Sequence, residues 1–250
     1  MGKNLLFSNP HVGKLNKYKK FGVFITTNNK KVATEADIII LAVRPGVVAV
    51  VIKEIKNKIK KNAIILSVAA CVDFELLENY FKPFKVKIVR LMPNIPVLYN
   101  CGVVGWVGNK NIGVGDKKTI KELLKPLGMI IDCKDEKELD RVDILAGCGP
   151  GIVAYIMRNF EKAAEKYGFS KILAEKMTRQ VFTGSLKHLE NTGIKSEDLI
   201  IQVATKGGIT EEVLRTLDVN RFYGMILKSI KKGYQKVIKI TEYLKRERKV

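Results

Sequence analysis

The run Ala36–Val43 constrains the fold more than any other stretch of this sequence. It reads Ala-Asp-Ile-Ile-Ile-Leu-Ala-Val, almost wholly apolar and rich in β-branched side chains. Such runs are typical of strands buried on both faces in parallel sheets that helices cover on each side. Arg44-Pro45-Gly46 interrupts the run, and helical spacing of apolar residues resumes over Val47–Lys58. The pattern predicts an α/β domain.

Short apolar runs of the same kind recur through the first half of the chain. Strands are predicted at 5–8, 21–26, 63–68, 87–92, 103–107 and 129–132, with a helix over 117–127. From about residue 138 onward the character changes to long helical segments, predicted over 139–168, 171–190, 196–203, 210–218 and 220–247. We therefore expect a Rossmann-like α/β domain over residues 1–138 and an all-helical domain over 139–250.

Composition narrows the class of protein. An apolar content of 46% and a charged content of 28% describe a soluble globular chain, and no apolar run approaches the roughly 18 residues of a membrane span. The first residues lack the layout of a signal peptide, so we expect a cytoplasmic protein. The four cysteines are widely spaced and the two histidines, His11 and His188, lie far apart. This disfavours a zinc site or a histidine-based triad and favours buried, reduced thiols.

The formal charge of +20 reflects 45 Lys plus Arg against 25 Asp plus Glu. Such a field attracts polyanions, so nucleic acid is a candidate partner. The lysines are, however, spread along the chain without an accompanying pattern of aromatic residues. We favour a solvated lysine-rich surface that also attracts a phosphorylated cofactor.

The carboxyl ends of the predicted strands share small, polar or proline-rich residues. In open α/β sheets the ligand lies outside these ends. The segments concerned are Ser8-Asn9-Pro10, Thr26–Asn29, Ala42–Pro45, Ser67–Ala70 and Met92–Asn94. Their composition suits a cofactor crevice.

A second candidate site lies in the segment Gln202–Thr210, which contains the pair Gly207-Gly208. Two glycines allow a tight turn and a close approach of a ligand to the backbone. A helix is expected to follow, with Thr210 as a candidate cap and two acidic residues in its first turn. Free N–H groups in such a turn suit a small anion such as a carboxylate. An ordinary loop is the alternative interpretation.

Five short segments occur in a recognisable order: Ala42-Val43-Arg44-Pro45, Ser67-Val68-Ala69-Ala70, Arg90–Pro96, Gly147-Cys148-Gly149-Pro150 and Gln202–Thr210. Together they resemble the motifs of the pyrroline-5-carboxylate reductase family, whose members reduce a cyclic imine to proline with NAD(P)H. The resemblance extends along nearly the whole chain. It implies a Rossmann-type domain followed by a helical domain that dimerises and completes the active site across subunits.

The resemblance also implies roles for individual residues. The cofactor, NADP or alternatively NAD, would contact residues at the strand ends, with Ser8 and Asn9 near a ribose 2′-phosphate: Ser8, Asn9, Asn29, Ala42, Arg44, Pro45, Ala69, Ala70 and Asn94. The carboxylate of a small imine substrate would bind Thr205 and the N–H groups of Gly207 and Gly208. Thr210 would hydrogen-bond the imine nitrogen and assist its protonation. Hydride addition to a C=N carbon needs mainly positioning and electrostatic support.

The sequence departs from the family at its beginning. A first strand with Gly-x-Gly-x-x-Gly is expected before a segment such as Leu5–Ser8, and the chain lacks that run. Three explanations compete: a natural start further upstream, closure of the remaining strands into a smaller sheet, or loss of cofactor binding. At the turn, Ala204, Lys206 and Ile209 replace a hydroxyl residue, a proline and a threonine of the family motif.

These observations favour a reductase of the pyrroline-5-carboxylate type. A non-catalytic paralogue that keeps the helical dimer but no longer binds the dinucleotide is the alternative, and a polyanion-binding protein is a third. Implied partners are the imine carboxylate and a second copy of the chain, whereas a role at nucleic acid or membrane is not favoured.

Overall fold

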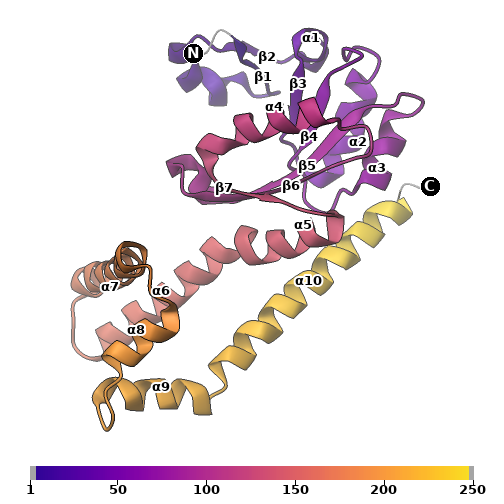
Figure 1. Ribbon diagram of the computed structural model, residues 1–250. Coiled ribbons are helices and arrows are strands. Elements are labelled where there is room, and N and C mark those ends of the chain that lie inside the picture. The colour runs from indigo at the N-terminus through magenta and orange to yellow at the C-terminus, as the bar shows by residue number, and fades with distance from the viewer. Residues whose placement is uncertain (1–3, 248–250) are drawn as a thin grey trace. The chain divides into compact units, whose positions relative to one another are not determined.

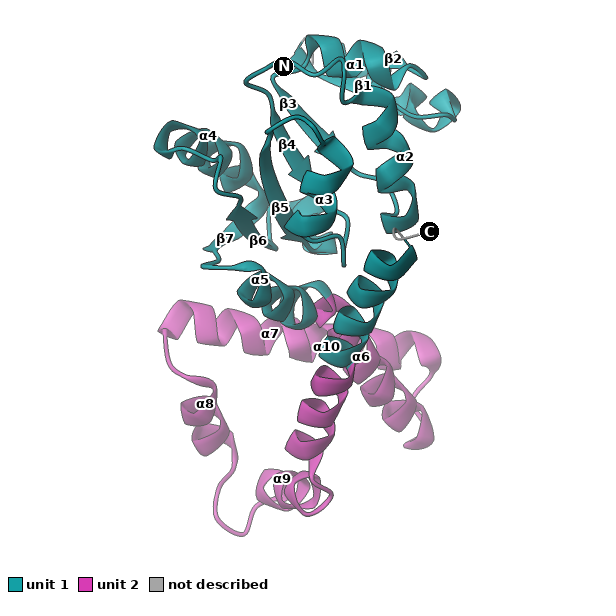
Figure 2. Cartoon of the chain, turned by 90° about the vertical axis from the view of Figure 1, so that its right-hand side faces the viewer, with its two compact units in different colours: residues 1–147, 233–250 teal, residues 148–232 magenta. Residues whose placement is uncertain are grey.

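The computed structural model describes residues 4–247, and the chain divides into two compact units. The first unit contains the residues up to Gly147 together with those from Gly233 onward, and the second contains Cys148–Lys232 (Figure 2). This differs from the expected division at residue 138. The difference arises at two places, the start of the helical region and the end of the chain.

At the first of these places, residue 138 lies inside a helix, α5 (Glu136–Val142), that packs on the sheet of the first unit. Leu139 of α5 is fully buried. A Cβ added at Gly105 in the sheet would lie 2.9 Å from a methyl carbon of Val142 and 3.0 Å from one of Leu139. Because the helix lies this close to the sheet, it belongs to the α/β unit.

A five-stranded sheet forms the centre of the first unit (Figure 1). Its order is β3-β4-β5-β6-β7; β3, β4 and β5 are parallel, β6 is antiparallel to β5, and β7 is parallel to β6. The strands are β3 Ile38–Leu41, β4 Ile64–Ser67, β5 Lys87–Pro93, β6 Gly102–Gly108 and β7 Gly128–Asp132. Each overlaps a predicted run, which confirms the α/β fold class.

Helices cover both faces of this sheet, as the apolar strands require. The neighbours Ile65 and Leu66 are fully buried on opposite faces: Ile65 packs with α1, α2 and α3, and Leu66 packs with α4. The helices are α1 Asn29–Glu35, α2 Pro45–Ile55, α3 Phe74–Phe81 and α4 Val114–Leu124, and two short 3₁₀ helices are η3 Ile95–Tyr99 and η4 Lys125–Leu127. Because successive side chains along a strand point to opposite faces, the sheet packs against a separate apolar core on each face.

The first two strands form a sheet of their own. β1 (Leu6–Ser8) pairs in parallel with β2 (Phe24–Thr26), and a 3₁₀ helix, η2 (Val12–Phe21), connects them. The predicted strand over 21–26 is thus confirmed only in its second half. β3 forms the edge of the larger sheet, with Ile40 56% exposed. Within the described residues the strands do not close into one smaller sheet, which removes the second of the three explanations for the unusual start.

The second unit is helical, as predicted. Its helices are α6 Gly149–Lys166, α7 Lys171–Thr192, α8 Ser196–Val203, α9 Ile209–Val219 and the beginning of α10 Phe222–Glu247. The single helix expected over 139–168 is instead three pieces: α5, a π-helical turn η5 (Asp143–Gly147), and α6. Glycines and Pro150 at the start of α6 explain the break, because proline has no N–H to continue a preceding helix.

Two further expectations can be compared with the structure. None of the described helices is long and apolar enough to span a membrane. The four cysteines are unpaired, but only Cys71 is buried; Cys133 is half-buried, and Cys101 and Cys148 are exposed. The expectation of uniformly buried thiols was therefore wrong, since Cys101 and Cys148 lie in connecting segments outside the two cores.

Candidate functional site

The structure places the predicted cofactor residues at strand ends. Ser8 ends β1, Asn9 follows it, and Asn29 begins α1 just after β2. The segment from Ala42 to Pro45 follows β3, with Arg44 exposed at the N-cap of α2. Ala69 and Ala70 follow β4, and Asn94 follows β5. Because β3, β4 and β5 are parallel, the last three segments lie together at the carboxyl ends of these strands.

The polar side chains near β1 differ in what they contact. The hydroxyl oxygen of Ser8 is buried and has no hydrogen-bond partner among the described residues. Asn9 accepts a hydrogen bond from the N–H of His11 at 2.8 Å, and Asn29 donates to Glu54 at 2.8 Å. A buried hydroxyl without a partner is costly in isolation, so Ser8 is the group here that best fits a polar ligand such as a ribose phosphate.

The segment after β4 forms a loop, Val68–Asp73, which we call the alanine loop. Ala69 is buried and its N–H donates to the hydroxyl of Ser67 at 3.4 Å. Cys71 has a φ of 63°, in the left-handed region that side chains other than glycine rarely adopt. Asp73 ends the loop as N-cap of α3, where its carboxylate accepts a hydrogen bond from the N–H of Leu76 at 3.0 Å. The loop is thus closely tied to its surroundings.

Asn94 connects three elements. Its side-chain nitrogen donates to the carbonyl of Ala146 in η5 at 3.0 Å, and its side-chain oxygen accepts from the N–H of Val103 in β6 at 2.9 Å. These bonds give Asn94 a structural role that the sequence did not reveal. A contact between Asn94 and the cofactor stays a prediction.

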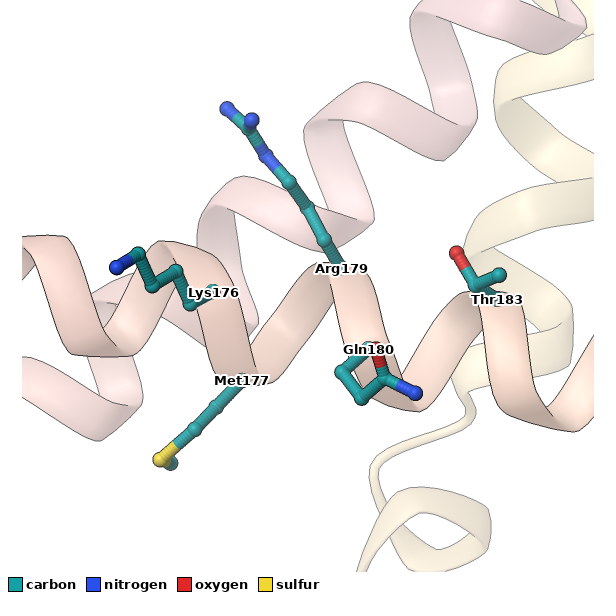
Figure 3. Close-up of a pocket in the computed structure, with 5 residues that line it drawn as sticks. All are labelled: Lys176, Met177, Arg179, Gln180 and Thr183. Atoms are coloured by element: carbon teal, nitrogen blue, oxygen red, sulfur yellow. The ribbon is translucent and has the colours of Figure 1, made fainter.

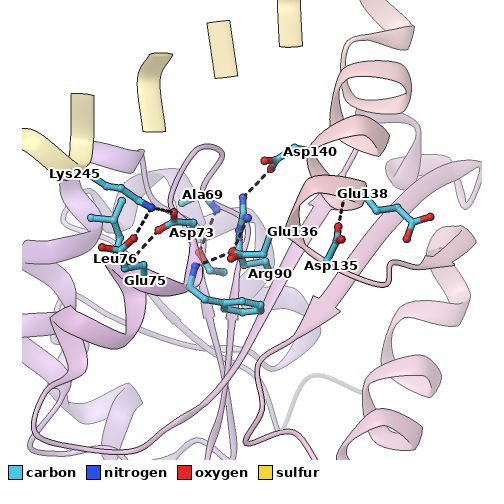
Figure 4. Close-up of polar contacts among 12 residues, drawn as sticks. Ala69, Asp73, Glu75, Leu76, Arg90, Asp135, Glu136, Glu138, Asp140 and Lys245 are labelled. Carbon is cyan, nitrogen blue, oxygen red and sulfur yellow. Dashed lines mark hydrogen bonds and ion pairs between the residues drawn. The ribbon is translucent and has the colours of Figure 1, made fainter. Parts of the chain in front are cut away.

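A buried charged cluster beside the alanine loop was also not foreseen (Figure 4). Arg90, in the middle of β5, is 1% exposed. Its guanidinium binds Glu136 at 2.8 Å and Asp140 at 3.3 Å, both on α5, and its Nε has no partner within the described part of the chain. Glu136 also accepts the N–H of Phe74 at 2.8 Å. In the sequence, this cluster is indicated by an arginine inside an apolar strand and by acidic residues spaced three and four apart between positions 136 and 143.

The acidic groups of this cluster have shifted pKa values. Burial raises the pKa of Glu136 and of Asp140, and the positive charge of Arg90 opposes the shift in both. Burial also raises the pKa of Asp143 in η5, and the nearby charge of Asp140 raises it further. Burial and then the charges of Asp140 and Asp143 raise the pKa of the Cys71 thiol. Cys71 is therefore held in the neutral form and is a poor nucleophile.

In the second unit, the glycine turn between α8 and α9 has a defined geometry. Gly207 has a φ of 73°, which favours glycine. A Cβ at Gly208 would lie 2.5 Å from the hydroxyl oxygen of Thr205, and the N–H of Gly208 donates to the Thr205 carbonyl at 2.9 Å. Both glycines are therefore required by the turn itself.

The helix start differs from the prediction in one respect. Gly208, not Thr210, is the N-cap of α9, and Thr210 lies in the first helical turn. Gly208 has the extended conformation that any N-cap residue can adopt, so the close approach of Thr205, and not the backbone angle, requires glycine here. The N–H of Gly207 donates to the carboxylate of Glu211 at 2.6 Å. The turn thus holds a carboxylate, supplied by the chain itself, at one of the groups predicted to bind the substrate.

An open hollow lies along α7, with a volume of about 530 Å³, and Figure 3 shows its lining side chains: Lys176, Met177, Arg179, Gln180 and Thr183. All of them come from one helix, and the side chains of Met177 and Arg179 point in different directions (Figure 3). A hollow with a single wall cannot enclose a small molecule. It is part of an exposed helix surface.

Exposed apolar side chains are frequent on the helices of the second unit. Only Ala174 and Thr178 are buried there among the described residues. Large side chains more than half exposed include Tyr155, Phe160, Ile172, Val181, Leu186, Ile201, Val213 and Met225. Monomeric proteins rarely expose so much apolar surface, which favours a second chain packed against these helices.

Comparison with known proteins agrees with this arrangement. Residues 136–240 match the pyrroline-5-carboxylate reductase dimerisation family, and residues 2–71 match the family of NADP oxidoreductases described as coenzyme F420-dependent. The pyrroline-5-carboxylate reductase 2 of Bacillus subtilis is 32% identical over 209 residues, covering 84% of this chain and 74% of the relative. The Aquifex aeolicus reductase is 29% identical over 241 residues, covering 96% and 89%.

A solved structure is similar as well. The Plasmodium falciparum pyrroline carboxylate reductase, determined with NADP bound, superposes with a TM-score of 0.85 at 25% identity and covers 96% of this chain and 88% of that one. The α/β unit and the helical unit thus define an NAD(P)H-dependent oxidoreductase with a helical dimerisation domain. The chain belongs to the pyrroline-5-carboxylate reductase family.

Proposed function

We propose that this chain reduces Δ1-pyrroline-5-carboxylate to L-proline by hydride transfer from NADPH, with NADH as the alternative donor. The observation that carries the proposal is the similarity to reductases of this name over 84% to 96% of the chain. A glycine turn of defined geometry in the helical unit supports it. The non-catalytic alternative is not favoured, because the similarity includes both the NADP-oxidoreductase and the dimerisation regions.

The first unit is proposed to hold the dinucleotide, which supplies the hydride when bound. The orphaned hydroxyl of Ser8 suits a polar group at the ribose end. Arg44, exposed at the start of α2, is proposed to contact the ribose and nicotinamide side of the cofactor together with Ala42 and Pro45. Ala70, half-buried just after β4, is proposed to leave room for a flat ring because its side chain is small, while the buried Ala69 beside it packs into the core. Asn9 and Asn29 complete the adenosine end of the proposed site.

The second unit is proposed to hold the substrate. The turn from Thr205 to Gly208 precedes α9, where the helix dipole favours an anion. The substrate carboxylate is proposed to displace that of Glu211 from the N–H of Gly207, while the N–H of Gly208 stays bonded to the Thr205 carbonyl. Binding the carboxylate here fixes the ring. Thr210 lies in the first turn of the same helix, and its hydroxyl is proposed to donate a hydrogen bond to the imine nitrogen. Because a hydroxyl is a weak acid, Thr210 relays a proton from water rather than supplying one.

The oxidation of NADPH in the presence of the cyclic imine tests this function directly. Purified protein should oxidise NADPH only when the imine is added, and Thr210→Val should reduce kcat by about 10²-fold or more, since general acid support typically contributes that much. Thr216→Val, on the same helix with its hydroxyl bonded to the carbonyl of Glu212, is the matched control. Absence of NADPH binding at millimolar concentration would favour the non-catalytic alternative instead.

The remaining partners and the location are proposals as well. The charge of +20 is proposed to attract the phosphorylated cofactor and not nucleic acid. Duplex binding that survives physiological salt would contradict this, because nonspecific binding by lysines weakens steeply with salt. A cytoplasmic location is proposed from the charged, globular composition, and cell fractionation tests it.

A further inference from the structure

The end of α10 contacts the alanine loop through one face of the helix. Thr241, Leu244 and Lys245 are spaced three and four residues apart, so their side chains lie on the same face. We call these three residues the strap. All three belong to the first unit, as does the loop. They also lie beyond residue 240, where the match to the dimerisation family ends.

Lys245 makes the strongest of these contacts (Figure 4). Its ammonium group binds Asp73 at 2.5 Å and Glu75 at 2.6 Å. The Asp73 side chain is only 15% exposed and that of Lys245 33%, so solvent screens this pair less than an ordinary surface ion pair. The other carboxylate oxygen of Asp73 caps α3 at Leu76. One carboxylate thus connects the loop, the helix after it and the strap.

Thr241 and Leu244 add two further contacts. The Thr241 hydroxyl lies beside Cys71, the residue of the loop with a φ of 63°, and lowers the pKa of its thiol against the larger effect of burial. Leu244 packs against the apolar core that includes α2 and α3. A left-handed conformation is unfavourable for a residue such as cysteine, and it persists only where neighbouring groups hold it. The strap supplies one of those groups.

We propose that Lys245 and Thr241 are positioning residues that hold the alanine loop in the conformation that receives the nicotinamide end of the cofactor. The proposal rests on the proposed function, because Ala69 and Ala70 of that loop are the residues assigned to this end. It makes the affinity for the dinucleotide depend on the last turns of α10. A strap that only stabilised the fold would lower the melting temperature and leave cofactor affinity unchanged.

The test compares Lys245→Met with Lys245→Arg in the full chain. Lys245→Met keeps the length of the side chain and removes both ion pairs, and Lys245→Arg keeps the charge. We expect Lys245→Met to raise the KM for NADPH about threefold to tenfold, with kcat and the KM for the imine changed less than about twofold. Lys245→Arg should restore most of the affinity. Lys239→Met, an exposed lysine on the same helix, is the control for net charge.

A second, milder variant keeps the proposal testable if Lys245→Met fails to fold. Thr241→Val is nearly isosteric and removes only the hydroxyl beside Cys71, so it should raise the KM for NADPH in the same direction by a smaller factor. Hydrogen exchange of the peptide 67–74 should accelerate in Lys245→Met and Thr241→Val but not in Lys239→Met. An equal KM for NADPH in Lys245→Met and Lys239→Met would overturn the proposal. Wild-type protein that neither binds NADPH nor reduces the imine would instead contradict the proposed function.

Discussion

Single residues decide how accessible the proposed substrate turn is. The N–H of Gly207 already donates to the carboxylate of Glu211, which lies four residues further along in the first turn of α9. A substrate carboxylate that uses the same N–H must displace that of Glu211 or lie beside it against electrostatic repulsion. Glu211 therefore competes with the substrate from within the chain.

Removing that competitor should improve substrate binding. We expect Glu211→Ala to lower the KM for the imine carboxylate about threefold to tenfold, since a charge-assisted hydrogen bond at an exposed site contributes on the order of 1 kcal/mol. Turnover at saturation should change little. Glu212→Ala removes the same charge from the next position, where the side chain binds Arg215 instead, and serves as the control. For a substrate analogue without the carboxylate, the two variants should have the same KM. If they also have the same KM for the carboxylate substrate, Glu211 does not compete at the turn.

A second residue-scale prediction concerns Asp143. Its pKa is raised by burial and by the charge of Asp140, so the folded state holds the proton more tightly than the unfolded state. The resulting stabilisation is complete below the unfolded pKa and is lost as the pH rises through the raised folded pKa. Asp143→Asn removes the buried charge, so its melting temperature should exceed that of the wild type at pH 8. The difference in melting temperature between the two proteins should shrink as the pH falls toward 4. A difference that grows at low pH would contradict this prediction.

At the scale of elements, Arg90 joins the centre of the sheet to α5. The guanidinium of Arg90 is almost fully buried, whereas the carboxylates of Glu136 and Asp140 keep some contact with solvent. Removing one partner of a buried ion pair leaves the other uncompensated. The cluster therefore fixes where α5 lies on β5 and β6.

We expect Arg90→Ala to reduce the free energy of unfolding by about 3 kcal/mol, through both the lost ion pairs and the cavity. Arg90→Met should cost less, because it refills the space and the two carboxylates can take up protons or water. Urea denaturation at pH 7 measures both. Equal losses for the two variants would mean that the charge, and not the volume, accounts for the whole effect.

At the scale of the whole molecule, the exposed apolar helices of the second unit and the match to a dimerisation family both indicate a homo-oligomer. Light scattering should give a mass of at least twice the 28.1 kDa of one chain. Leu186→Asp, at a position 60% exposed on α7, should shift the protein toward monomer, because a buried unpaired carboxylate at an interface is strongly unfavourable. Val50→Asp, 67% exposed on α2 in the first unit, should leave the mass unchanged.

Much of the architecture follows from local pattern. The apolar runs around Ile65 and Val89 identify strands because their side chains alternate between two buried faces whatever the connections between strands. The run around Ile39 also forms a strand, but it lies at the edge of the sheet with Ile40 56% exposed, so the expectation that it is buried on both faces was wrong. The bounds of α7 and α8 were predicted to within two residues, since amphipathic spacing and the caps at Ser170 and Gly193 are local signals. The order of short motifs was sufficient to identify the family.

What the sequence by itself determined is therefore the fold class, the helical second half and the glycine turn, all of which depend on residues close together in the chain. Only the tertiary structure decided that Arg90 meets Glu136 across 46 residues and that Lys245 meets Glu75 across 170. It also decided that β1 and β3 lie in separate sheets and that the end of α10 belongs to the first unit. The physical reason is that such contacts depend on how elements pack in space, and periodicity within one element carries no information about its distant partners.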